Sequence, residues 1–380
     1  MGVFIPPHHP NEEDPTLAIQ RDLELVEFLE QLGYHEAWIG EHHSGGFEII
    51  SSPEIFIAAA AERTKRIMLG SGVVSLPYHN PLMVAERFLQ LDHQTRGRSM
   101  LGIGPGQLQS DARMLGISAS TQRERMIESL GIILRLFAGE TVTYESEWIT
   151  LNKAHTNLKP YTNPHPLIAV ASAVTPTGAK LAGEHGLGML CLAASVFAAY
   201  DVLDVNWRIA CKTAEKNGLS MDPSQLRLVV PMHLAETRER AWSNIQFGFK
   251  QWEDYSFSVN PKTGLLGLGG IEEAVENGLA VVGTPDDAVD CLEKYWKKTG
   301  GFGCFLHLAT NWADFDNTKK SYELFARYAV PKFTNRNSQR INSLKNMKKN
   351  SDVYSESYRA ASQAAIDSHF SNEVKGSIEK

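Results

Sequence analysis

The sequence predicts an α/β fold in which strand–helix units close into a (β/α)8 barrel. Short apolar runs rich in β-branched residues alternate with helical patterns along most of the 380 residues. About eight such runs precede residue 333, and most of them are followed by a helix. This alternation implies parallel strands joined by right-handed crossovers. A doubly wound open sheet would show the same pattern, and the count of eight favours the barrel.

The first helix has clear signals at both ends. Asp14 is its expected N-cap, Pro15 stands at its first position, and Gly33 ends it. Residues 141–151 alternate and predict a hairpin inserted outside the main series. Strands are expected at residues 2–5, 35–40, 67–76, 99–104, 166–171, 186–192, 226–234 and 301–309. Helices are expected at residues 15–32, 53–63, 81–95, 121–137, 198–218, 284–298 and 317–329, with a further one opening near residue 175.

The end of the chain differs from the rest in composition. Residues 334–380 contain few large apolar side chains and many Ser, Asn and Lys residues. Such a segment cannot bury a core of its own. We therefore expect a barrel over residues 1–333 and a C-terminal tail over residues 334–380 that is weakly helical or partly mobile.

Composition excludes several classes of partner. The formal net charge of −7 provides no basic surface for nucleic acid, and no run of 18 apolar residues is present to span a membrane. The N-terminus lacks the basic and apolar regions of a signal peptide. The four cysteines have no CxxC spacing, so we expect reduced, buried thiols in a cytoplasmic protein.

Histidines follow the first three expected strands. His8 and His9 follow the first, His42 and His43 the second, and His79 the third. The carboxyl ends of barrel strands open onto one face, where barrel enzymes have their active sites. Any one of these histidines is readily explained as a hydrogen-bonded structural residue. Five histidines on one rim indicate an active site there.

A metal site is the first candidate for that chemistry. Barrel metallohydrolases place two histidines one residue apart on a strand, so that both point inward. Here His8 and His9 are adjacent and would face opposite ways, and the chain has no HExxH motif. We expect no metal.

Glycines and hydroxyls suggest a flat, phosphorylated ligand. Gly102, Gly104 and Gly106 form G-x-G-x-G, which is not the full dinucleotide motif. They either make room for large side chains inside the barrel or let the backbone approach a flat ring. Farther along, Thr175 is an expected N-cap before Pro176, and free N–H groups at a helix start bind phosphate. The hydroxyls of Ser172, Thr175 and Thr177 would assist.

Several of these residues stand in motifs of one known family. The chain resembles the bacterial luciferase-like family of flavin-dependent monooxygenases in "WIGEHHSGG", in "LPYHNPLMVAERFLQLDHQTRGRSMLGIGPG" and in "AGEHGLGML". Its opening "FIPPHHP" and the stretch "GPGQLQSDARMLGI" are especially similar to the limonene monooxygenase-like branch. The similarity covers roughly residues 1 to 333.

The resemblance implies an activity and its partners. Family members are (β/α)8 barrels that take reduced FMN from a separate NAD(P)H-dependent flavin reductase. Dioxygen attacks this flavin, and the resulting flavin peroxide transfers one oxygen atom to a small organic substrate, here expected to be apolar. Family members commonly form homodimers through their early helices. The expected helix at residues 81–95 is apolar on more than one side, which agrees with such a contact.

The resemblance also assigns residues. His42 corresponds to the family's catalytic histidine, and the Gly72–Val73 bond to a cis peptide beneath the flavin ring. The phosphate loop of luciferases contains an arginine where this chain has Pro105 or Gln107, so main-chain N–H groups are expected to hold the phosphate. The expected cofactor-binding residues are Gly72, Val73, Gly104, Ser172, Ala173, Val174, Thr175, Thr177 and Gly178. The expected substrate pocket contains His8, His9, His43, Tyr78 and His79.

Two other functions remain open for the same fold. One is a deazaflavin-dependent oxidoreductase, which would transfer hydride and ignore oxygen. The other is a flavin-binding barrel without catalysis. Residues 251–270 have no clear periodicity and several glycines, so we expect a lid over the flavin there.

Overall fold

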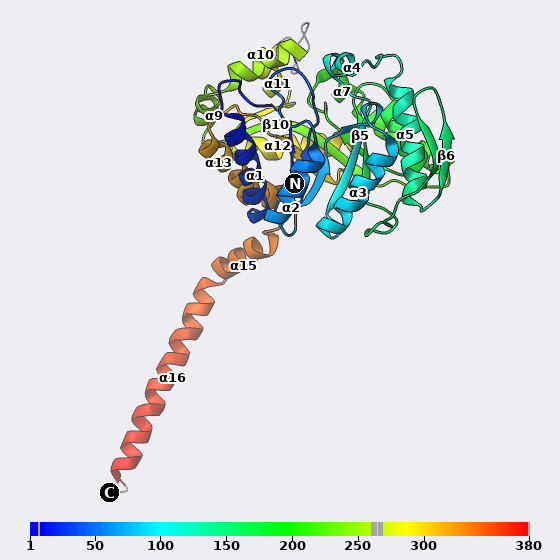
Figure 1. Cartoon of the computed structure of the whole chain (residues 1–380). Helices are drawn as coiled ribbons and strands as arrows, with labels where there is room; N and C mark the ends of the chain where they lie inside the picture. The colour runs from blue at the N-terminus through cyan, green and yellow to red at the C-terminus, as the bar shows by residue number, and fades with distance from the viewer. Residues whose placement is uncertain (7, 260–263, 265–268, 379–380) are drawn as a thin grey trace. The chain divides into compact units, whose positions relative to one another are not determined.

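Parallel strands close into a barrel, as the sequence predicts. The computed structural model describes residues 1–6, 8–259, 264 and 269–378, and these form two compact units, Met1–Val330 and Pro331–Lys380. The first unit contains the barrel, with helices around it (Figure 1). The barrel strands are, in order around the ring, β1 (Gly2–Ile5), β2 (Glu36–Ile39), β3 (Met68–Ser71), β5 (Ser99–Gly104), β8 (Leu167–Ser172), β9 (Gly188–Cys191), β10 (Leu226–Leu234) and β12 (Cys304–Leu308).

Short strands extend or accompany the ring. The hairpin of β6 (Val142–Glu145) and β7 (Thr150–Ala154) forms a separate antiparallel sheet, as expected. β4 (Val74–Ser75) continues beside the end of β5. β11 (Val281–Gly283) pairs only with the last residues of β10, and its three residues were too few to be recognised from the sequence.

Most helices begin where the sequence signals them. Asp14 caps α1 by accepting from the Leu17 N–H, and Asn80 caps α3 by accepting from the Leu82 N–H. The helix expected at residues 198–218 is instead divided into two at Val202. The helices are α1 (Pro15–Gln31), α2 (Pro53–Arg63), α3 (Pro81–Thr95), α4 (Gln109–Met114), α5 (Gln122–Phe137), α6 (Thr177–His185), α7 (Phe197–Asp201), α8 (Leu203–Lys216), α9 (Arg238–Ile245), α10 (Phe249–Val259), α11 (Gly270–Glu276), α12 (Pro285–Thr299), α13 (Phe315–Leu324) and α14 (Val330–Phe333).

The expected lid is partly helical. Its first nine residues lie in α10, where Trp252 and Tyr255 are buried on one face three residues apart. Residues 260–263 and 265–268 of the expected lid lie outside the described residues.

The barrel interior is filled around Trp38, which is fully buried. A Cβ atom on Gly70 would lie 2.7 Å from the Trp38 ring, and one on Gly102 would lie 3.1 Å from it and collide with the Ser71 carbonyl. These two glycines therefore make room for a large side chain. That is the packing explanation of the glycine-rich strands.

The sequence argument for a dimer contact through α3 was wrong. Val84, Phe88, Leu89 and Leu91 are buried within the chain itself, because α3 packs against both α2 and α5. Of the large apolar residues on this helix, only Met83 is strongly exposed. The apolar sides of α3 consequently give no evidence about a second subunit.

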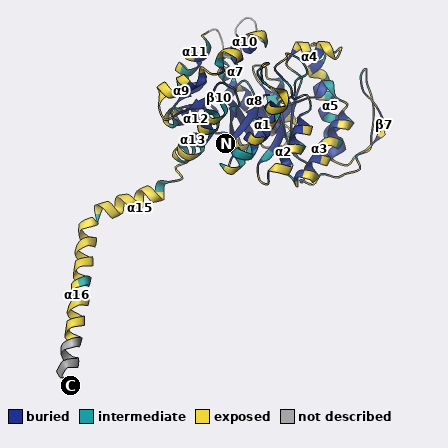
Figure 2. Ribbon diagram, turned by 60° about the vertical axis from the view of Figure 1, so that its left-hand side comes forward, coloured by how far each residue is buried: buried dark blue, intermediate teal, exposed yellow. Residues whose placement is uncertain are grey.

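The second unit consists of exposed helices. α15 (Ser338–Lys349) and α16 (Ser351–Ile378) are exposed along nearly all of their described side chains (Figure 2). Among the described residues, no helix is long and apolar enough to cross a membrane. The large apolar side chains exposed here are Ile341, Leu344, Met347, Val353, Tyr354, Tyr358, Ile366 and Phe370.

An ion pair at the amino-terminal end of the barrel strands predicts a large stability effect. Arg227 bonds both oxygens of Glu36, with Nε and Nη2 each 2.9 Å away; the Arg227 side chain is buried, and the Glu36 side chain is only 12% exposed. Arg227→Met leaves the Glu36 carboxylate unpaired, so the free energy of unfolding should fall by about 3–5 kcal/mol in urea titrations. Arg238→Met breaks an exposed pair with Asp287 and should change little. Equal effects of the two changes would contradict this assignment.

Candidate active site

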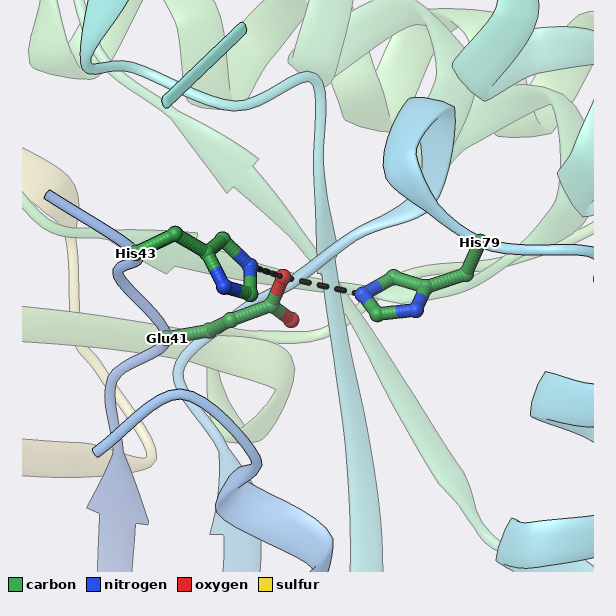
Figure 3. Close-up of side chains that lie close together, drawn as sticks. All are labelled: Glu41, His43 and His79. Atoms are coloured by element: carbon green, nitrogen blue, oxygen red, sulfur yellow. Dashed lines mark hydrogen bonds and ion pairs between the residues drawn. The ribbon is translucent and has the colours of Figure 1, made fainter. Parts of the chain in front are cut away.

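Glu41 joins two histidines at the barrel mouth. Its Oε1 accepts from His43 Nε2 at 3.0 Å and from His79 Nε2 at 2.9 Å, and its Oε2 accepts from the Ser75 N–H at 3.2 Å. Figure 3 shows the two imidazoles meeting the carboxylate from the loops after β2 and before α3. All three ligand-type atoms lie close enough together for a metal. However, N–H donors already satisfy both carboxylate oxygens, so we interpret the cluster as an anchor between loops.

Charge and hydrogen bonding reinforce this anchor. Burial would raise the pKa of Glu41, but the hydrogen bonds from His43 and His79 lower it below its ordinary value. The hydrogen bond to Glu41 raises the pKa of His43, although burial opposes this effect. The pair therefore favours a carboxylate beside a protonated imidazole.

His42 has different partners from its two neighbours. Its Nδ1 lies 3.0 Å from Asp111 Oδ2 and 3.4 Å from Glu48 Oε2. Because a carboxylate accepts, Nδ1 carries a proton. Its Nε2 has no hydrogen bond to the residues that the structure describes, and the side chain is 23% exposed. Nε2 is thus the nitrogen that is available for chemistry.

Two acidic residues at this site were missed from the sequence. Asp111 lies in α4 and Glu48 in the loop after β2, and both carboxyl groups are buried. Asp111 also accepts from the His43 N–H and the Ser44 hydroxyl, which fixes the loop between them. The motif "GPGQLQSDARMLGI" contains Asp111 and was the available signal.

The remaining predicted pocket residues fall into separate groups. Tyr78 lies beside His43, with ring centroids 6.0 Å apart, and its hydroxyl accepts from Gln122 at 3.1 Å. His9 Nε2 lies 2.7 Å from Asp22 of α1, which makes it a structural link to that helix. His8 is buried between Phe47 and Tyr255. Burial, together with the neighbouring His9, lowers the pKa of His8 to about 4.

The expected backbone feature after β3 is present. The Gly72–Val73 peptide bond is cis, which confirms that prediction. A Cβ atom on Gly104 would lie 2.5 Å from Val73 Cγ2, and one on Gly72 would lie 2.6 Å from the Phe4 ring. Close packing therefore requires glycine at position 72, next to Phe4, and at position 104, next to Val73.

The residues that the sequence predicts for a phosphate site lie after β8. α6 begins at Thr177 and its N-cap is Pro176, whose carbonyl accepts from the Lys180 N–H, so the prediction of Thr175 as N-cap was wrong by one residue. The Ser172 hydroxyl is buried and has no hydrogen-bond partner in the described part of the chain. A Cβ atom on Gly178 would collide with the Ala171 carbonyl. An unused hydroxyl beside a helix start fits a phosphate.

Comparison with known proteins identifies the family. Residues 1–301 match the model of the luciferase-like monooxygenases. The chain belongs to this family. It is 45% identical over 336 residues to limonene 1,2-monooxygenase of Rhodococcus erythropolis, covering 87% of this chain and 86% of that protein. It is 41% identical over 341 residues to 4-hydroxyprotoasukamycin monooxygenase of Streptomyces nodosus subsp. asukaensis, with 87% and 91% covered.

Solved structures of luciferase-like and related enzymes share the fold. A monooxygenase from Streptomyces bottropensis matches with a TM-score of 0.78 and 25% identity, covering 87% of this chain and 99% of that one. The oxygenating constituent of 3,6-diketocamphane monooxygenase from Pseudomonas putida, in complex with FMN, matches with a TM-score of 0.75 and 23% identity, covering 87% of this chain and 98% of that one.

A more distant sequence relative uses another cofactor. An F420-dependent glucose-6-phosphate dehydrogenase of Amycolatopsis mediterranei is 26% identical over 294 residues, or 72% of this chain and 84% of that protein.

The anchor at Glu41 predicts a pH-dependent stability difference. The raised pKa of His43 means that its stabilisation is complete below its ordinary pKa of 6.5 and is lost as pH rises through the folded-state value. The Glu41→Gln variant lacks this stabilisation. Its Tm deficit against the parent should therefore be larger at about pH 6 than at about pH 9, by about 1–2 °C.

A carboxylate on the surface provides the control for this test. Glu27 pairs with Arg63 and is partly exposed, so Glu27→Gln should give a small deficit that does not change with pH. A deficit of Glu41→Gln that grows toward alkaline pH would contradict the assignment. Because the pKa of Glu41 is lowered, Glu41 titrates at more acidic pH, and its ionisation does not change between about pH 6 and about pH 9.

Proposed function

We propose that this protein is a two-component, FMN-dependent monooxygenase. It takes reduced FMN from a separate NAD(P)H-dependent flavin reductase, uses dioxygen, and transfers one oxygen atom to a small apolar organic molecule. The observation that carries this proposal is the buried, unpartnered Ser172 hydroxyl beside the start of α6, on the same rim as His42. The two monooxygenases that are 45% and 41% identical support it.

The residues after β8 and β3 suit FMN. The Ser172 hydroxyl and the first N–H groups of α6, from Thr177 and Gly178, would hold its phosphate, with Ala173, Val174 and Thr175 in the connecting loop. Gly72, Val73 and Gly104 would lie beneath its ring system. Bound FMN in its reduced form supplies the electrons and the site at which dioxygen reacts.

The chain's own residues would control protons and water. His42 can take or return a proton at Nε2, because Asp111 keeps the other ring proton at Nδ1. Glu41, His43 and His79 hold the surrounding loops together and exclude water from the mouth. Tyr78 and His8 would line the substrate pocket, and His9 would support it through its contact with Asp22 of α1.

We further propose that the enzyme is a cytoplasmic homodimer.

A deazaflavin-dependent oxidoreductase is the second candidate, and the relationship to the F420-dependent dehydrogenase of Amycolatopsis mediterranei motivates it. The lower identity of that relative, 26% against 45% for limonene 1,2-monooxygenase, favours a monooxygenase, and the FMN complex of the 3,6-diketocamphane monooxygenase constituent supports FMN as its cofactor. A flavin-binding barrel without catalysis is the third. It would bind FMN and give no product.

Oxygen transfer should be detectable with a flavin reductase present. Purified protein, NADH, FMN and air, supplied with limonene, other monoterpenes and small ketones, should yield a product one oxygen atom heavier by mass spectrometry. Under 18O2 the product should carry the label. His42→Ala should still bind FMN but should lower product formation by about 10²–10⁴-fold and release hydrogen peroxide instead.

Three results would count against these roles. Coupled, full-rate oxygenation by His42→Ala would remove its catalytic assignment. Activity that is abolished by a chelator and restored by zinc would revive a metal at Glu41, His43 and His79. Hydride transfer from reduced F420, without oxygen uptake from reduced FMN, would establish the deazaflavin enzyme instead.

Ser172 provides a test of the phosphate cradle. Because its hydroxyl has no other partner among the described residues, Ser172→Ala should weaken binding of FMN by about 10-fold to 100-fold, the value of one hydrogen bond to a charged group. Binding of riboflavin, which has no phosphate, should stay the same. Fluorescence titration of both flavins measures the two constants, and equal losses for both flavins would exclude the cradle.

A further inference from the structure

Glu48 is a buried carboxyl group that the proposed function does not use. Only 1% of its side chain is exposed, and its Oε2 lies 3.4 Å from His42 Nδ1 and has no hydrogen-bond partner among the residues that the structure describes. Its other oxygen, Oε1, accepts a hydrogen bond from the hydroxyl of Tyr255 in α10. A buried acidic group is costly unless something in its surroundings compensates for it. The compensation here comes from His42 on one side and Tyr255 on the other.

Two carboxyl groups thus face one nitrogen. Asp111 is the nearer of the two. Its Oδ2 lies 3.0 Å from His42 Nδ1 and accepts a hydrogen bond from it. Glu48 is too far for a good hydrogen bond but close enough to act through its charge. These are the two charged groups that face His42 in the described part of the chain. A neutral imidazole between two ionised carboxylates would leave two like charges buried together, so the state of Glu48 matters to His42.

The surroundings of the two carboxyl groups differ. Burial would raise the pKa of Asp111, but hydrogen bonds from His42 and Ser44 lower it, so Asp111 is a permanent anion at neutral pH. Burial raises the pKa of Glu48, against the opposing effects of His42 and Tyr255. Glu48 is therefore the carboxyl group whose ionisation depends on its neighbours.

Tyr255 is held in place to donate to Glu48. Its ring centroid lies 4.5 Å from that of His8 and 5.5 Å from that of Phe47, so two neighbouring rings pack against it. The backbone of Glu48 pairs with that of His8 in an isolated antiparallel bridge, which holds the loop after β2 in place. Burial raises the pKa of Tyr255 well above its ordinary value, so its hydroxyl keeps its proton and stabilises the ionised form of Glu48.

We propose that Glu48 is a positioning residue that sets how firmly His42 holds its proton, and that Tyr255 controls Glu48 from α10. Ionised Glu48 favours the charged imidazole and neutral Glu48 does not. The proton affinity of His42 is then linked to the seating of α10, about 200 residues away in the sequence. The inference extends the proposed function, which gives His42 its acid/base role.

Histidine titration of the free, full-length protein tests this link. In two-bond 1H–15N spectra of 15N-histidine-labelled protein, the His42 signals are identified by their loss in His42→Ala. Glu48→Gln removes the charge and should lower the pH midpoint of the His42 titration by about half a unit or more. Tyr255→Phe should lower it by less, because Glu48 keeps its carboxyl group. The double variant should match Glu48→Gln, since Tyr255 acts only through Glu48.

Controls separate this role from a structural one. Tyr295→Phe removes the same atom from another buried tyrosine, whose hydroxyl donates to the Ala194 carbonyl, and should leave the midpoint unchanged. Glu48→Asp keeps the charge and should recover part of the shift; it also serves if Glu48→Gln does not fold. An unchanged midpoint in Glu48→Gln, or additive shifts in the double variant, would overturn the proposal. Because neither flavin nor oxygen is present, this result is independent of the oxygenation assay.

Discussion

The packing of Trp38 inside the barrel is the constraint on which the rest of the structure depends. Its indole fills the space between β3 and β5, so neither strand can carry a side chain where it faces the ring. Gly70 and Gly102 meet this demand, and any Cβ atom at either position would enter the indole or the neighbouring backbone. The Trp38 Nε1 donates to Glu36, which in turn holds Arg227 at the opposite end of the strands from the site. Trp38 thus sets how closely β3 and β5 pack in the barrel interior, and it also contacts the ion pair at the amino-terminal end of the strands.

Because those strands run together so closely, their ends bring distant loops into contact. Glu41 leaves β2 and meets His79 from the loop before α3, while Asp111 of α4 meets the backbone of His43. The first contact joins two loops, and the second joins a loop to α4. The three consecutive residues Glu41, His42 and His43 therefore have different structural roles. Glu41 and His43 anchor the loops, and His42 between them is left with one free nitrogen.

The sequence predicted what depends on periodicity and local signals. The eight barrel strands and the cap at Asp14 follow from apolar runs and from a side chain that acts on its own helix. It could not show that Glu48 and Asp111 are buried, because acidic residues in polar loops are mostly exposed. Their burial arises from contacts between segments far apart in the chain. The helix start after β8 was missed by one residue, since Thr175 and Pro176 both suit a cap.

The glycines were ambiguous for a physical reason. A strand in which glycine alternates with apolar residues looks the same whether the empty side faces a ligand or a neighbouring side chain. Gly70 and Gly102 face Trp38, whereas Gly104 faces Val73 beside the cis bond. All three glycines therefore make room for a neighbouring side chain, and Gly104 differs only in lying at the carboxyl end of β5.

The charges at the mouth explain why imidazoles are used there. Three buried carboxyl groups, those of Glu41, Glu48 and Asp111, are compensated by His42, His43, His79 and a tyrosine hydroxyl. An arginine or lysine in their place would hold a fixed positive charge at every working pH. Imidazoles can be charged or neutral near neutrality, so the mouth can gain or lose a proton without water entering. The three imidazoles therefore compensate the buried carboxyl groups without placing a fixed positive charge at the mouth.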